Sequence, residues 1–365
     1  MDIAIIDADL IRRKNHRFPN LASMKLSSYY KNAGNNVVLE TNYDNLHSYD
    51  KILISKVFTD TVVPEEVLQM DNVEYGGTGF FYDKAPKLPD EIEHCFPDYH
   101  LYDDFIKSEI ARGINPKKFR EYTDCSIGYT TRGCIRQCKF CVNQNYTKAS
   151  LHSKIEEFYD PSRKYICLLD DNVLACKDWK QIFEELIATN HRFYFKQGMD
   201  ERLLTEEKCE YLFQKSKYYG DYTFAFDNIK DRKLIESKLQ MIRRFTDRQC
   251  MFYVFCAFNH ENPGKYSEEF WVIDITDLFE RIKILMKYRC LPYVMRFKDY
   301  EISPYRGMYI TIARWCIQIS IFKKKTFREF CMMNGENSSS MKYMLEFEKK
   351  YPAIAKEYFD MRFPQ

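Results

Sequence analysis

The chain has 365 residues, which is enough for one large domain or two domains of ordinary size. Its apolar content of 45% and charged content of 30% are typical of a globular protein, and a formal net charge of +2 does not support a nucleic-acid partner. No apolar run of about 18 residues predicts a membrane span, and no signal peptide precedes the first apolar run. With thirteen cysteines, we therefore expect a cytoplasmic protein whose thiols are free or bind metal.

The first 83 residues predict a small α/β domain with a flavodoxin-like (Rossmann-type) sheet. Short apolar runs that end in polar residues or glycine are typical of buried parallel strands. They occur at Ile3–Ile6, Val37–Leu39, Lys51–Val57 and Val73–Tyr75. A helix is expected to begin at Pro19 and to end at Gly34.

Residues 84–124 predict a connector between two domains. Periodicity is weak in this stretch, and four prolines interrupt it: Pro86, Pro89, Pro97 and Pro116.

Residues 125–325 predict a second, larger α/β domain, because strands and helices alternate regularly. The expected strands are Ser126–Thr130, Tyr165–Leu169, Phe193–Phe195, Tyr222–Phe226, Met251–Phe255 and Pro292–Met295. The expected helices are Asp178–Ala188, Glu206–Lys215, Arg232–Phe245, Ile275–Tyr288 and Ile310–Ile321. This pattern predicts a partial (β/α)6 TIM-like barrel, with its chemistry at the carboxyl ends of the strands. Residues 326–365 are expected to form a helical cap that includes a helix over Met341–Tyr358.

A tight group of cysteines follows the first barrel strand. Cys134, Cys138 and Cys141 have C-x3-C-x2-C spacing, and three thiolates this close can ligate three irons of a cubane iron–sulfur cluster. No fourth cysteine stands at a matching spacing, so one iron would keep an open position for chemistry. A zinc site is the alternative, but it usually needs four ligands, and the nearest candidate is Cys125. Ordinary buried thiols are a second alternative.

The cysteine run, with Phe140 directly before the third cysteine, resembles the signature of the radical S-adenosylmethionine (radical SAM) superfamily. The resemblance covers roughly residues 124–325. It implies a 4Fe-4S cluster whose open iron binds the amino and carboxylate groups of S-adenosylmethionine. It also implies one-electron cleavage to a 5′-deoxyadenosyl radical that takes a hydrogen atom from a substrate, with a reductase, flavodoxin or ferredoxin as electron donor. The sequence does not identify the substrate.

Polar residues at the next two strand ends are candidate contacts for S-adenosylmethionine. The resemblance implies that at least one of Asp170, Asp171 and Asn172 contacts the methionine ammonium, for which a carboxylate is a good acceptor. A helix N-cap is the alternative for one of these three residues.

The next strand end contains Gln197, Asp200 and Arg202, and the resemblance implies that these residues face the ribose and carboxylate of S-adenosylmethionine. An ion pair between Asp200 and Arg202 that holds the loop is the alternative. Later strand ends contain the candidates for substrate contact: Asp227, Asn228, Asn259 and Arg296. Gly133, just before the first cysteine, is expected to give the loop backbone room.

The amino-terminal domain resembles the cobalamin-binding domain of one radical SAM subclass. Ser55 and Gly76–Gly77 are similar to its later elements, but the Asp-x-His-x-x-Gly motif is absent from Asp7–His16. Some members bind cobalamin without a histidine ligand, so cobalamin is not excluded. Our preferred interpretation is a degenerate domain that is used for substrate or partner contact.

Two other functions remain open. One is methyl or methylthio transfer to a nucleic-acid base or peptide, although the lack of a second tight cysteine group counts against methylthio transfer. The other is a zinc-stabilised nucleic-acid-binding module, which needs a fourth ligand and a basic surface.

Overall fold

The structure is a computed structural model that describes residues 1–13 and 18–364. Part of the segment compared with the cobalamin motif, Lys14–His16, lies outside the described residues. The chain forms two compact units, Met1–Lys196 and Gln197–Gln365, which we describe separately. The division falls within the predicted barrel segment. The predicted domain boundaries at residues 83, 124 and 325 stay predictions.

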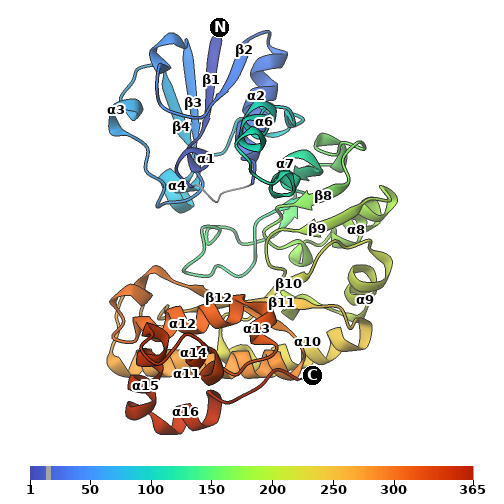
Figure 1. The fold of residues 1–365 in the computed structure, drawn as a ribbon. Coiled ribbons are helices and arrows are strands. Elements are labelled where there is room, and N and C mark those ends of the chain that lie inside the picture. Colours follow the sequence, from blue (N-terminus) through green and yellow to red (C-terminus); the bar gives the residue numbers. More distant parts are fainter. Residues whose placement is uncertain (14–17, 365) are drawn as a thin grey trace. The chain divides into compact units, whose positions relative to one another are not determined.

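The first unit begins with a parallel sheet in the order β2-β1-β3-β4 (Figure 1). All four strands were predicted, and they are β1 (Asp2–Asp7), β2 (Asn36–Glu40), β3 (Lys51–Ser55) and β4 (Val73–Gly76). Short helices follow three of them: α1 (Ala8–Arg12) after β1, α3 (Glu65–Leu68) after β3 and α4 (Thr78–Phe81) after β4.

One face of this sheet is covered by α2 (Leu21–Asn32), which begins where Asn20 Oδ1 accepts from the Ser23 amide at 3.1 Å. Residues 84–124 pack in the same core through buried aromatic side chains, including Tyr99 and Phe119. This predicted connector contains the short helices α5 (Asp90–Glu93), α6 (Asp103–Ala111) and α7 (Arg120–Thr123). Helices this short have too few turns to produce the periodicity that sequence reasoning needs.

A second parallel sheet in the first unit has the order β5-β8-β9. Its strands are β5 (Cys125–Gly128), β8 (Tyr165–Leu168) and β9 (Arg192–Phe195), and α8 (Trp179–Ala188) lies between the last two in sequence. A small antiparallel pair, β6 (Thr131–Arg132) and β7 (Ser150–Leu151), brackets the cysteine loop.

The second unit contains a parallel sheet in the order β10-β11-β12. Its strands are β10 (Tyr222–Ala225), β11 (Cys250–Cys256) and β12 (Leu291–Arg296). Its longer helices are α10 (Arg232–Phe245), α11 (Glu268–Lys287) and α12 (Arg306–Ile317). The predicted helix at 206–215 begins as α9 (Glu206–Cys209) and continues as a π-helical segment over Glu210–Lys215.

The carboxyl-terminal part of this unit is helical, with α13 (Ile319–Phe322), α14 (Phe327–Met333), α15 (Ser339–Lys350) and α16 (Pro352–Tyr358). The predicted single helix over Met341–Tyr358 is wrong. Tyr351 leaves the helical region at φ −133° and ψ 63°, and Pro352 starts a new helix. Proline is tolerated in the first turn of a helix but not in the interior, where its ring clashes with the preceding turn.

The six strands predicted for residues 125–325 are therefore present, in two parallel three-stranded sheets that follow the chain order. The protein is a mixed α/β structure with parallel sheets, as expected. Closure into a partial barrel and the flavodoxin-like assignment stay predictions. Within residues 1–13 and 18–364, no helix is long and apolar enough to cross a membrane.

Candidate functional site

The cysteine loop lies between β6 and β7, which pair Thr131 with Leu151 and Arg132 with Ser150. Its three cysteines are all partly exposed. The other described cysteines are buried, except Cys95. Thiols that only fill a core are normally buried, so the partial exposure of Cys134, Cys138 and Cys141 fits a segment that binds a ligand.

Gly133 begins the loop in a conformation that suits glycine, with φ +94°. A Cβ at this position would lie 2.4 Å from the carbonyl oxygen of Lys148. The glycine therefore allows the two ends of the loop to approach each other. The prediction that Gly133 provides backbone room is confirmed for this close approach.

Asp170 anchors the start of the loop with both of its carboxylate oxygens. Oδ1 accepts from Thr130 Oγ1 at 2.6 Å, from the Thr131 amide at 2.6 Å and from Thr131 Oγ1 at 2.7 Å. Oδ2 accepts from the Thr130 amide at 3.1 Å. Burial raises the pKa of Asp170, and the hydrogen bonds from the two threonines oppose that shift. Asp170 therefore has a structural role, because its carboxylate holds Thr130 and Thr131 at the start of the loop.

Asp171 ties both ends of the loop together. Its Oδ2 accepts from the Gly133 amide at 2.7 Å, and its Oδ1 accepts from Asn143 Nδ2 at 2.7 Å. Gly133 precedes the first cysteine and Asn143 follows the third, so one carboxylate spans the whole motif. Hydrogen bonds to an ionised acceptor are among the stronger ones in proteins.

Asn172 contacts the motif itself. Its Nδ2 donates to Cys134 Sγ at 3.3 Å, while its Oδ1 is buried without a hydrogen-bond partner among the described residues. The side chain is only 3% exposed and makes no helix-capping hydrogen bond, so the N-cap alternative is not realised by this residue. A buried acceptor without a donor costs free energy unless a ligand supplies one.

The third cysteine and its neighbours also have polar contacts. The Asn143 amide donates to Cys141 Sγ at 3.4 Å. The Phe140 carbonyl accepts from Tyr82 Oη at 2.8 Å, so the segment after α4 contacts the loop. The proximity of Cys141, after the larger effect of burial, contributes to the raised pKa of Tyr82.

The three cysteine sulfurs are the right type of ligand for an iron–sulfur cluster, but they are not close enough together to bind one. The loop presents three cysteine sulfurs, and backbone or amide N–H groups face two of them. Within the part of the chain that the structure describes, however, no three His, Cys, Asp or Glu side chains are grouped closely enough to hold a metal ion. The structure therefore brings Asp170, Asp171 and Asn172 to the cysteine loop without gathering the three sulfurs.

In the second unit, the strand-end residues form an ion-pair network. Arg202 Nε lies 2.7 Å from Asp200 Oδ1, and Arg202 Nη1 lies 2.7 Å from Asp231 Oδ2. The ion pair between Asp200 and Arg202 is the one that the sequence analysis gave as the alternative to contact with S-adenosylmethionine. Gln197 is exposed. The predicted contacts of Gln197, Asp200 and Arg202 with S-adenosylmethionine stay predictions.

Sequence reasoning missed Glu201, which stands between two residues that it named. Glu201 is 0% exposed, its Oε2 accepts from the Ala225 amide at 3.2 Å, and its Oε1 has no hydrogen-bond partner in the described chain. Burial, followed by the nearby charge of Asp200, raises the pKa of Glu201 to about 8. Nothing in the local sequence distinguishes it from its charged neighbours.

Arg281 was also missed. Its Nη1 donates to the carbonyls of Phe226, Asp227 and Phe255 at 3.0, 3.1 and 2.7 Å, which joins the carboxyl ends of β10 and β11. The side chain is buried although it lies on a helix, α11. The sequence contained one sign of this role, because Arg281 falls on the apolar side of the predicted helix, where a charged residue is unusual.

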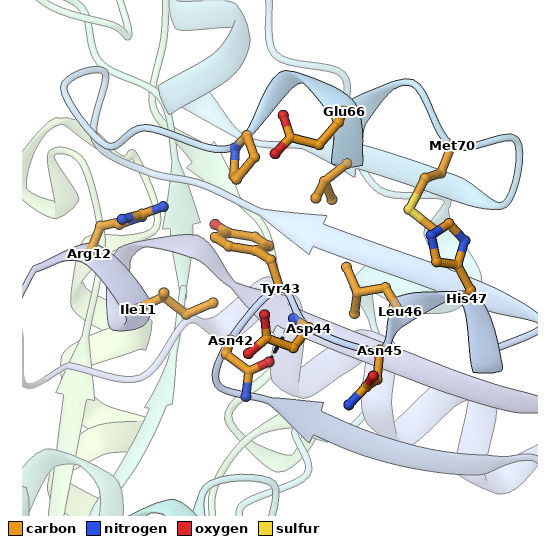
Figure 2. Close-up of a pocket in the computed structure, with 12 residues that line it drawn as sticks. Ile11, Arg12, Asn42, Tyr43, Asp44, Asn45, Leu46, His47, Glu66 and Met70 are labelled. Atoms are coloured by element: carbon orange, nitrogen blue, oxygen red, sulfur yellow. Dashed lines mark hydrogen bonds between the residues drawn. The ribbon is translucent and has the colours of Figure 1, made fainter.

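A pocket of about 650 Å³ lies in the amino-terminal domain, lined by segments that follow β1, β2 and β3 (Figure 2). Figure 2 shows Arg12, Tyr43 and His47 among its lining side chains. The Tyr43 hydroxyl is buried without a hydrogen-bond partner in the described residues, and burial raises the pKa of Tyr43 to about 12. Its lining includes both polar and apolar side chains.

No family model and no curated protein matches the chain. Among solved structures, it is similar to the cobalamin-dependent S-adenosylmethionine radical enzyme OxsB with aqua-cobalamin and S-adenosylmethionine bound. That match has a TM-score of 0.45 and 12% identity, and covers 96% of this chain and 61% of the OxsB chain. The apo form of OxsB matches with a TM-score of 0.39 and 11% identity, over 98% and 56% of the two chains. Similarity at this level does not define a family.

Proposed function

We propose that the protein is a radical SAM enzyme that binds a 4Fe-4S cluster at Cys134, Cys138 and Cys141. The observation that carries this proposal is the cysteine loop itself, which Asp171 ties at both ends while Asn172 donates to the sulfur of Cys134. A bound cluster would supply one electron for the reductive cleavage of S-adenosylmethionine.

The side chains around the loop have separate tasks in this proposal. Asp170 fixes the first residues of the loop, and Asp171 holds its two ends together. Asn172 directs an N–H group at a ligand sulfur, and such hydrogen bonds tune cluster potential. Its unpartnered Oδ1 is a suitable acceptor for the methionine ammonium of S-adenosylmethionine.

Cluster assembly requires the loop to draw its three sulfurs together, because they are not gathered in the described chain. Metal binding commonly supplies the free energy for such ordering. The three cysteines are partly exposed, and Asp171 holds Gly133 and Asn143 on either side of them, while Tyr82 holds Phe140 between the second and the third. On cluster binding the three cysteines would move closer together, while Asp171 would keep its hydrogen bonds to Gly133 and Asn143.

The rest of the predicted assignment belongs to the same proposal. The strands of residues 125–325 would form the partial barrel, and Gln197, Asp200 and Arg202 would face the ribose and carboxylate of S-adenosylmethionine. A reductase, flavodoxin or ferredoxin would supply electrons in the cytoplasm. The amino-terminal domain would contact substrate or a partner, with cobalamin as a further candidate ligand.

The proposal is tested by anaerobic reconstitution with iron and sulfide, followed by metal analysis, EPR and incubation with dithionite and S-adenosylmethionine. We expect about four irons per chain and release of 5′-deoxyadenosine, and we expect Cys134→Ala, Cys138→Ala and Cys141→Ala to lose both. Cys95→Ala is the matched control, because Cys95 is also partly exposed but lies outside the motif.

Other results would redirect the assignment. Retention of cobalamin would favour methyl transfer, and release of methylthioadenosine with a second cluster would favour methylthio transfer. Stoichiometric zinc in anaerobically prepared protein, with no cleavage of S-adenosylmethionine, would overturn the proposal and support a zinc-stabilised binding module.

A further inference from the structure

Two buried cysteines in the second unit lie opposite each other on neighbouring strands. Cys250 is the first residue of β11, and Cys290 directly precedes β12. The ladder pairs Met251 with Leu291, so Cys250 and Cys290 occupy the preceding pair of positions. Neighbouring strands lie about 4.8 Å apart, and disulfide-bonded residues have Cα separations of about 4.4–6.8 Å. The backbone therefore already has the spacing that a disulfide needs.

The two thiols affect each other's ionisation and share a neighbouring cation, Arg243. Cys250 Sγ lies 3.7 Å from Arg248 O and Cys290 Sγ lies 3.5 Å from Tyr288 O. The interaction with Cys250 is the largest cause of the lowered pKa of Cys290. Arg243 Nη2 lies 3.2 Å from Cys290 Sγ, and its guanidinium lowers that pKa further. Burial acts in the opposite direction. A neighbouring guanidinium favours the thiolate, which is the form of cysteine that reacts.

Arg243 is held firmly in this position by backbone carbonyls. Its Nε donates to Tyr288 O at 2.8 Å, and its Nη1 donates to Thr246 O at 3.0 Å and to Arg248 O at 2.9 Å. The guanidinium thus joins the two loops that lead into β11 and β12. The guanidinium is partly exposed, whereas Cys250 and Cys290 beneath it are each 0% exposed, so a peroxide reaches them only when these loops open.

We propose that Cys250 and Cys290 form a reversible disulfide when the protein meets a peroxide. The Cys290 thiolate attacks one peroxide oxygen and is oxidised to a sulfenic acid, while the other oxygen leaves and takes up a proton to become water. The Cys250 sulfur then attacks the sulfenic sulfur, and a second water leaves as the S–S bond forms. Two thiols and one hydrogen peroxide give one disulfide and two waters.

The bond would join the amino ends of β11 and β12 and close a ring that includes all of α11. A cross-link across a long segment restricts the unfolded chain, which stabilises the folded state. The oxidised protein should therefore melt at a higher temperature than the reduced protein. This modification is independent of the cysteine loop, which lies in the other unit.

A second buried pair in the same chain provides a matched comparison. Cys125 and Cys167 lie on the neighbouring strands β5 and β8, but Cys167 pairs with Ile127, two residues beyond Cys125. That offset places their Cα atoms about 8 Å apart, beyond disulfide range. Tyr194 interacts with both thiols, at 3.7 Å from Cys125 Sγ, and burial raises both pKa values. This pair should stay reduced.

The test treats the full-length protein with hydrogen peroxide, blocks free thiols by alkylation and maps peptides by mass spectrometry without reduction. We expect a linked peptide that contains Cys250 and Cys290, its loss on treatment with dithiothreitol, and a rise of several degrees in melting temperature. Cys290→Ser should abolish the linked peptide and the rise, whereas Cys125→Ser should leave both unchanged. The linked peptide is sought in the wild-type protein, so the test does not depend on whether the Cys290→Ser variant folds.

The role of Arg243 is tested by the rate of the reaction. Arg243→Gln should slow disulfide formation at pH 7 by about tenfold and shift its pH profile upward, because the thiolate loses its cation. Mapping that shows free thiols at both positions, or sulfinic acid in place of a linked peptide, would overturn the proposal. Equal formation of a Cys125–Cys167 link would also overturn it, since the argument from strand register would then fail.

Discussion

Asn172 Nδ2 donates to the sulfur of Cys134 at 3.3 Å. This contact joins a strand end of the second sheet to the first residue of the cysteine motif, although 38 positions separate them in the chain. The same side chain leaves its Oδ1 buried without a hydrogen-bond partner in the described residues. The Asn172 amide can therefore donate to the sulfur of Cys134 through Nδ2 and accept a hydrogen bond from a bound small molecule through Oδ1.

Asn172→Asp tests the first half of this arrangement. The carboxylate keeps the size of the side chain but replaces an N–H donor with a negative charge, so we expect a lower cluster potential and slower release of 5′-deoxyadenosine. An EPR-monitored redox titration of the reconstituted protein measures the potential. Asn115→Asp is the control, because Asn115 is exposed and its Oδ1 accepts from the Lys117 amide, a role that a carboxylate keeps. An unchanged potential in Asn172→Asp would contradict the assigned role.

Asp171→Ala should release the cysteine loop while leaving the rest of the fold intact. The substitution removes the acceptor of both the Gly133 amide and Asn143 Nδ2. Segments that lose such anchors open more often and become more accessible to proteases. We expect cleavage within residues 133–149 to be about tenfold faster in limited proteolysis. Asp178→Ala is the control, since Asp178 makes no capping hydrogen bond, and equal cleavage of the two variants would count against this role.

Gly133→Ala and Gly34→Ala separate backbone strain from steric clash. Both glycines have positive φ, at +94° and +80°. A Cβ at Gly133 would lie 2.4 Å from Lys148 O, whereas a Cβ at Gly34 meets nothing within 4 Å. Gly34→Ala should cost about 1 kcal/mol of unfolding free energy, and Gly133→Ala should cost clearly more. Denaturant unfolding measures both, and equal costs would show that the close approach at Lys148 is not constraining.

Glu201→Gln should change how stability depends on pH. Burial raises the pKa of Glu201 to about 8 from an ordinary value of 4.5. The unfolded chain releases this proton near pH 4.5 but the folded protein keeps it until about pH 8, so stability falls as pH rises through that window. Glutamine does not ionise, so the melting temperature of the variant relative to wild type should rise by several degrees between pH 5 and pH 8.

The control for this pH experiment is Glu269→Gln, which changes an exposed carboxyl at the start of α11. It should show no such trend. If the difference in melting temperature between Glu201→Gln and wild type were the same at pH 5 and pH 8, Glu201 would not retain its proton in the folded protein.

Much of the secondary structure could be predicted, because apolar runs such as Ile3–Ile6 and Met251–Phe255 are long enough to identify buried strands. The helices of the segment over residues 84–124 could not be predicted, since each is too short to show a period. The break at Tyr351–Pro352 was missed although proline marked it. The candidate cluster ligands could be identified because C-x3-C-x2-C spacing is a local feature of the sequence. The burial of Glu201 could not, because it depends on packing against residues far away in the chain.

The sequence by itself determined which residues can supply thiolates, where most strands lie, and that polar residues follow the strands. Local spacing and apolar patterning contain that information. Only the tertiary structure decided that Asp170 serves two threonines, that Asp171 ties the loop ends, that Asn172 contacts Cys134, and that Cys250 faces Cys290. Those roles depend on strand register and on which buried polar groups still lack a partner, and both are settled only when the whole chain packs.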